Sequence, residues 1–219
     1  MRMPPRIRRR TYSPLCSVKI NPLIKKHTLA AVLSGLLSLQ AGIVCAQDAP
    51  AAIPGGNPEF FSTQEKLFRV LRNGDTLSFS AQRYGGISSF DALNPFKILV
   101  FSEAFQKIYY LDHRLSPLSE TLSLSALGFG NVCCVCASRY GGFWVYDRWQ
   151  QRLSRVNAQG QTVATSEAFP VLDLKDVFPC SIREKGDRLY VFGRDSGAYI
   201  FDLFGAYITS DPRMNLSDL

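Results

Sequence analysis

Four cysteines in the second half of the chain have the clearest capacity for chemistry, because cysteines bind metal ions or form disulfides. Cys133 and Cys136 have the Cys-x-x-Cys spacing of half a zinc site. No second pair follows, and the only histidine near them in sequence is His113, so we predict no metal site. In an exported chain a disulfide is allowed, and Cys134 and Cys180 hold matching places in neighbouring repeats. That pair is our disulfide candidate; the alternative is that all four cysteines are small buried hydrophobic residues.

The sequence lacks the residue patterns that mark an enzyme active site. It contains no Gly-x-Ser-x-Gly, no His-Glu-x-x-His and no phosphate-binding glycine loop. After Ala46 there is one histidine, His113, at an expected turn. An Asp or Asn recurs once per repeat, at Asp112, Asn157 and Asp202. We interpret these as turn residues, because a hard-cation site needs several converging oxygens. The sequence therefore predicts no catalytic residue, no metal, no cofactor and no enzyme.

Recognition has better candidates than catalysis. One turn of each repeat carries aromatic or basic residues, namely Phe105, Arg148, Trp149 and Arg194. Trp, Tyr and Arg dominate the hot spots of protein interfaces. We expect these turns to lie on one rim of the molecule and to contact another protein. The alternative is that the aromatic rings fold back over the edge of the sheet.

Three copies of one strand pattern must position these turns. Residues 98–101 are echoed 45 residues later at 143–146, and again at 189–192. All three segments are apolar on both faces, which is typical of a strand between two sheets. Turn residues recur about every 8–12 positions, and no long amphipathic helix pattern is present. This period predicts an all-β array of four-stranded blades, as in a β-propeller.

The repeats place three blades at about 87–131, 132–177 and 178–219, after a partial set of strands around 68–80. The last strands of the three blades should carry Leu118, Val163 and Ile208. Most propellers have more blades, so the chain could be an unusual four-bladed ring, an open array or an incomplete propeller, and we favour the incomplete propeller.

The positive charge of the chain is concentrated at its N-terminus. The formal net charge is +7, but residues 1–46 hold eight Lys and Arg and no acid, which leaves 17 basic against 18 acidic residues in 47–219. Lys25-Lys26, the uncharged stretch 28–44 and a small residue at Ala46 are typical of a secretory signal. We predict a signal peptide with a long basic leader at 1–46, a flexible Ala/Pro/Gly linker at 47–65 and a propeller-like domain at 66–219. A retained membrane helix, a lipidated Cys45 and a twin-arginine signal fit the sequence less well.

Residues 84–208 resemble a group of uncharacterised exported β-propeller-like proteins of Bacteroidetes-type bacteria. The residues that carry the resemblance are 86–91, 94–101, 143–147 and 199–205. The resemblance implies a periplasmic or outer-membrane-facing protein with no assigned chemistry. The characteristic WD40 dipeptide is absent.

Together these observations predict an exported, non-enzymatic binding or scaffolding protein of the cell envelope. We expect it in the periplasm, associated with the outer membrane and with an envelope protein as partner. It should bind no nucleic acid and, after signal cleavage, should not be integral to the membrane. A propeller-type hydrolase or lyase acting on a sugar or phosphate ester is one alternative, and a truncated, non-functional remnant is another.

Overall fold

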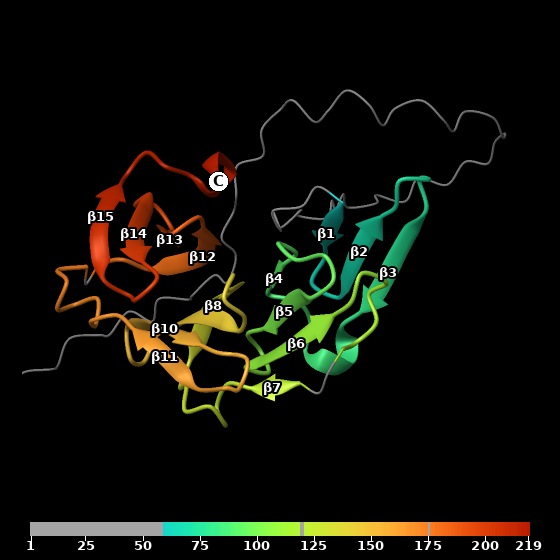
Figure 1. Cartoon of the computed structure of the whole chain (residues 1–219), viewed down its shortest axis with the longest axis horizontal. Helices are drawn as coiled ribbons and strands as arrows, with labels where there is room; N and C mark the ends of the chain where they lie inside the picture. The colour runs from blue at the N-terminus through green and yellow to red at the C-terminus, as the bar shows by residue number, and fades with distance from the viewer. Residues whose placement is uncertain (1–58, 119–120, 175) are drawn as a thin grey trace, which may run out of the picture. The chain divides into compact units, whose positions relative to one another are not determined.

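The computed structural model describes residues 59–118, 121–174 and 176–219. The expected signal segment and residues 47–58 of the expected linker lie outside these ranges. The described residues form antiparallel sheets, and their helical elements are the two short 3-10 turns η2 (Gln82–Tyr84) and η3 (Leu216–Asp218). The predicted all-β, propeller-like fold is confirmed (Figure 1). Among the described residues, no helix has both the length and the apolar character needed to cross a bilayer.

Four antiparallel sheets, which we name A to D, follow one another along the chain (Figure 1). Sheet A contains β1 (Phe60–Ser62), β2 (Lys66–Val70) and β3 (Thr76–Ser80). Sheet B contains β4 (Ser89–Asp91), β5 (Ile98–Ser102), β6 (Lys107–Leu111) and β7 (Leu122–Ser123). Sheet C contains β8 (Val132–Ala137), β9 (Phe143–Asp147), β10 (Arg152–Val156) and β11 (Thr162–Thr165). Sheet D contains β12 (Pro179–Lys185), β13 (Arg188–Gly193), β14 (Ala198–Asp202) and β15 (Tyr207–Asp211).

Two strands depart from the sequence-based expectation. Strand β1 lies inside the range 47–65, which was expected to be a linker. The predicted end of the linker at residue 65 is therefore wrong, and the sheet begins no later than Phe60. In sheet B the regular edge strand is β7, which does not include Leu118. The chain nevertheless pairs with β6 at this point, because Pro117 forms an isolated bridge with Leu111 and the Leu118 amide donates to the carbonyl of Tyr110 (2.9 Å).

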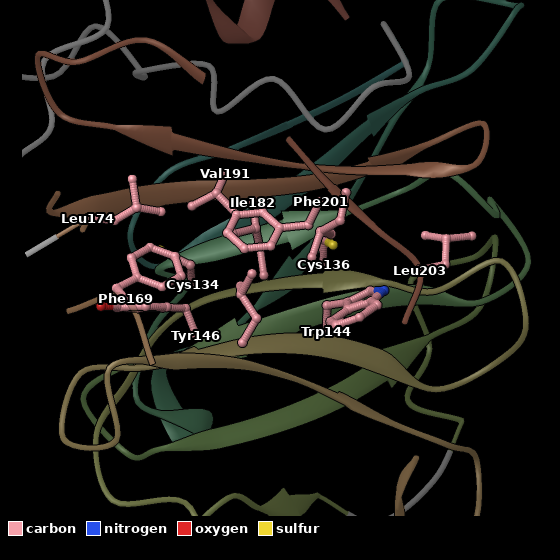
Figure 2. Packing of buried hydrophobic residues seen from close by; sticks show 12 residues of the cluster. Cys134, Cys136, Trp144, Tyr146, Phe169, Leu174, Ile182, Val191, Phe201 and Leu203 are labelled. Atoms are coloured by element: carbon pink, nitrogen blue, oxygen red, sulfur yellow. The ribbon is translucent and has the colours of Figure 1, made fainter. Parts of the chain in front are cut away.

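Neighbouring sheets bury their apolar faces against each other. One hydrophobic cluster joins sheets A and B, a second joins B and C, and a third joins C and D. Every residue of β5 and of β9 is buried, because each strand lies between two neighbouring sheets. Figure 2 shows the C–D cluster, in which Trp144 and Tyr146 of sheet C face Ile182, Val191 and Phe201 of sheet D. The apolar runs of the sequence are thus explained by stacking of equivalent sheets.

The recurring Asp and Asn residues close the turn between the third and fourth strands. The Oδ1 atom of Asp112 accepts hydrogen bonds from the amides of Arg114 and Ser116, both at 2.8 Å. Oδ1 of Asn157 and of Asp202 makes the same pair of contacts, two and four residues ahead. The hydrogen bond from the Ser116 amide is the main cause that lowers the pKa of Asp112. The interpretation of these residues as turn formers is confirmed.

Candidate binding rim

Three hairpin turns join the second and third strands of sheets B, C and D, and we call them the rim turns (102–107, 147–152 and 193–198). In each, the second residue is held to its own sheet through its backbone amide: Glu103 donates to Ser88 Oγ, Arg148 to the Asn131 carbonyl and Arg194 to the Phe178 carbonyl. Gln106 and Gln151 both have φ of 51°, and Gly197 has φ of 75°. A residue in this left-handed region reverses the chain. The three rim turns are therefore built alike.

Two aromatic residues of the rim turns pack against glycines. The Phe105 ring lies so close to Gly85 that a Cβ added there would be 2.4 Å from Phe105 Cγ. The Trp149 ring stands against Gly130 in the same way, with 2.2 Å between such a Cβ and Trp149 Cε3. Each ring nevertheless keeps much of its surface exposed, 52% for Phe105 and 76% for Trp149. A glycine thus supports one part of each ring while the rest faces solvent.

A buried carboxylate holds the turn that carries Trp149. Asp147, at the end of β9, is 1% exposed. Its oxygens accept hydrogen bonds from the backbone amides of Gly130 (2.6 Å), Asn131 (3.2 Å), Trp149 (2.8 Å) and Gln150 (3.3 Å). The same side chain therefore fixes both the Trp149 turn and the Gly130 segment beneath the ring. Bonds to a charged acceptor are stronger than those between neutral groups.

The rim turns of sheets B and C are joined to each other. Arg148 Nη1 contacts Glu103 Oε1 at 2.6 Å. The Gln106 side-chain amide donates to the Val132 carbonyl (2.9 Å), and its Oε1 accepts from the Val132 amide (2.8 Å). The ion pair is solvent-exposed and is worth at most about 1 kcal/mol. The paired amide contacts set the spacing of the two turns, so Phe105, Arg148 and Trp149 lie on adjacent turns.

The fourth predicted rim residue, Arg194, occupies the turn of sheet D that corresponds to the turn of Arg148. Its backbone amide bonds the carbonyl of Phe178, a residue that is 71% exposed. Phe178, which was not predicted from the sequence, therefore adds an exposed aromatic ring next to the third rim turn. Gly85 and Gly130 were not predicted from the sequence either. Their separation of 45 residues, the period of the strands, was the available signal.

All four cysteines of the repeats are thiols in the structure. Cys133 Sγ and Cys134 Sγ are 3.5 Å apart, and Cys133 Sγ lies 3.7 Å from the Pro179 carbonyl oxygen. The hydrogen bond with Cys134 lowers the pKa of the Cys133 thiol, and the nearby Arg148 charge adds to this effect. The Cys134–Cys180 disulfide stays a prediction. In the described ranges no group of three or more His, Cys, Asp or Glu side chains is arranged to hold a metal ion.

A cavity of about 350 Å³ lies where the end of β11 meets the β14–β15 turn. Its lining includes Thr165, Glu167, Leu172, Phe204 and Tyr207. Glu167 is the one carboxylate in this lining. A single carboxylate without a base or a second acid is not a catalytic constellation. None of the rim aromatic residues contributes to this cavity.

No protein-family model matches the sequence, and no curated protein matches it either. Comparison with solved structures does find similar folds. Virginiamycin B lyase from Staphylococcus aureus is 9% identical, with a TM-score of 0.50, and the match covers 71% of this chain and 52% of the lyase. BBS1N in complex with ARL6DN is 15% identical, with a TM-score of 0.50, and covers 76% of this chain and 55% of that one.

A protein of unknown function from Bacteroides caccae is 14% identical, with a TM-score of 0.49, and covers 73% of this chain and 57% of that one. The chain thus spans about half the length of the solved structures it resembles. Propeller-type folds are what the chain is similar to. The bacterial group expected from the sequence has no support at the level of a family match.

These comparisons correct one prediction. The expectation that the chain is not an enzyme is wrong as an exclusion, because the fold it adopts is also the fold of a lyase. At 9% identity the likeness shows the fold alone. Propeller folds host many unrelated activities, so no catalytic residue is carried over from the lyase.

Proposed function

We propose that the chain is an exported binding module of the cell envelope that holds a partner protein on the rim turns of sheets B and C. One observation carries the proposal: Trp149 presents a ring that is 76% exposed and yet fixed in place. The Gly130 backbone supports the ring, and the buried Asp147 carboxylate holds both segments together.

A fixed ring is favourable for binding because little conformational entropy is lost when a partner covers it. Phe105 presents a second supported ring on the neighbouring turn, and the Arg148 guanidinium pairs with Glu103 across the two turns. Aromatic and arginine side chains together are typical of the centre of a protein interface. The structure of BBS1N, which has a similar fold, holds ARL6DN in a complex, and this supports a partner-binding role for such a scaffold.

The periplasm, and association with the outer membrane, are parts of this proposal. They are supported by the basic, then apolar N-terminal segment described above, with a small residue at Ala46.

The proposal is tested by affinity capture from an envelope fraction with the wild-type protein and three variants. Trp149→Ala removes the ring, and Gly130→Ala keeps the ring but places a methyl group where it lies. Both should reduce the recovered partner at least tenfold, since truncating a hot-spot residue costs about 2 kcal/mol or more. Val163→Ala, on β11 and 48% exposed, is the control and should recover the wild-type amount. Unchanged recovery with Trp149→Ala, or no partner with the wild type, would overturn the proposal.

A further inference from the structure

The outer face of sheet D carries apolar residues at the strand positions that form the interfaces between sheets elsewhere in the molecule. The face of sheet D toward sheet C contains Leu189, Val191 and Phe201, which belong to the C–D cluster. Side chains alternate along a strand, so Tyr190 and Ile200 point to the opposite face. These two residues are partners in the register of β13 and β14, and both are partly exposed.

The equivalent positions in sheets B and C are interface residues. Tyr190 corresponds to Leu99 in sheet B, which packs in the B–C cluster, and to Trp144 in sheet C, which packs in the C–D cluster. Ile200 corresponds to Tyr110, another member of the B–C cluster. Sheet D therefore presents to its outer side the positions that each preceding sheet buries against its successor. In the described part of the chain, no core cluster joins sheet D to sheet A.

Sheet A also has an apolar outer face. Leu67 on β2 and Phe60 on β1 belong to the cluster with sheet B. Phe61 and Phe68 are register partners on the opposite face, and their rings stack with centroids 4.8 Å apart. Both rings are partly exposed. The chain thus has an apolar sheet face at each end of its row of packed sheets.

We propose that two copies of the chain associate, with the outer face of sheet D in each copy packed on the outer face of sheet A in the other. The contact continues the B–C and C–D interfaces, in which equivalent positions are already buried. The described residues of one chain form four sheets, so two copies supply eight from these residues. Closed propellers contain about four to eight blades, so this number completes a ring.

This arrangement makes a specific prediction about mixtures. The interface is head-to-tail, and two such contacts close the ring. Analytical ultracentrifugation of the purified exported protein should show a dimer at micromolar concentration. Ile200→Asp on sheet D and Phe68→Asp on sheet A should each sediment as a monomer, with at least a 100-fold rise in the dimer dissociation constant. An equimolar mixture of the two variants should recover a dimer, because it retains one pair of undamaged faces.

The control is Val163→Asp on the edge strand β11, which should remain a dimer. Circular dichroism verifies that each variant is folded; Ile200→Thr and Phe68→Ser replace any variant that is not. A wild-type protein that stays monomeric when its concentration is raised 100-fold would overturn the proposal. This holds regardless of which segment of the same chain then covers the outer face of sheet D. A dimer that survives either single substitution would also overturn it, because the contact would then lie elsewhere. Monomeric variants whose mixture gives no dimer would exclude the head-to-tail contact.

Discussion

At the scale of single residues, the three rim turns have the same geometry but carry different residue types at equivalent positions. The last residue of the second strand is Ser102 in sheet B and Asp147 in sheet C. The Ser102 hydroxyl donates to the Gly85 carbonyl (2.9 Å), whereas the Asp147 carboxylate accepts four backbone amides. In sheet D the position is Gly193, and the Ser196 hydroxyl occupies the space that a side chain would take. The turns of sheets B and C are thus anchored by different side chains and the turn of sheet D by its backbone, which is why no single motif marks the rim in the sequence.

Buried tyrosines make the stability of the domain sensitive to high pH. Burial between sheets B and C raises the pKa of Tyr110 to about 12, and burial also raises the pKa values of Tyr109 and Tyr146. In the unfolded chain a tyrosine ionises near pH 10. The folded state favours the neutral phenol, so this stability is fully present below pH 10 and is lost as the pH rises through the folded-state pKa.

The ultraviolet absorbance of the wild-type protein and of Tyr110→Phe is titrated with pH. The difference between the two curves isolates the ionisation of the Tyr110 phenol. We expect its midpoint at about pH 12 in the native protein. In urea it should move to about 10. A native midpoint at 10 would show that Tyr110 is not buried between the sheets.

At the scale of strands and sheets, a buried carboxylate on sheet D completes the interface with sheet C. Glu184 of β12 is 4% exposed. Its Oε2 accepts from the Trp144 indole nitrogen (2.8 Å) and its Oε1 from the Arg139 amide (2.9 Å), and both donors belong to sheet C or the turn that follows β8. The largest side chain in this cluster is thereby fixed in orientation as well as buried.

Glu184→Ala leaves the buried Trp144 indole N–H and the part-buried Arg139 amide without their acceptor. We expect the free energy of unfolding to fall by about 2–3 kcal/mol, which urea denaturation measures. Glu184→Gln keeps an acceptor and should cost less than half as much. Glu167→Ala, at an exposed glutamate, is the matched control and should change stability by no more than about 0.5 kcal/mol. A loss for Glu184→Ala as small as that of the control would contradict the proposed role of this carboxylate.

The sequence predicts strands well where they lie between two sheets and poorly at the margins. Strands β5 and β9 follow from their apolar runs, because burial on both faces produces a continuous pattern. Strand β1 has three residues and β7 has two, too few for any periodicity to appear. The supports of the rim aromatics were missed for another reason. A glycine under a ring is recognised by the contact it permits, and contacts between distant residues are visible only in three dimensions.

At the scale of the whole molecule, repetition separates structural from functional requirements. The side chains on the faces of the sheets form the core. The backbone of each rim turn is held by hydrogen bonds to its own sheet, so the core does not restrict which side chains the rim turns carry. Binding surfaces on loops of a rigid scaffold are common for this reason. The proposed dimer and the proposed rim use different residues, so failure of one proposal would leave the other intact.

The most direct test of the rim as a binding surface is site-specific photo-crosslinking in living cells. A photoreactive phenylalanine analogue replaces Trp149 in one variant, Phe105 in a second and Val163 in a third. The two rim positions should give a crosslinked adduct with the same partner protein, and position 163, which is exposed on β11, should give none. Adducts of equal yield from position 163, or no adduct from position 149, would contradict the assignment of the rim turns as the binding surface.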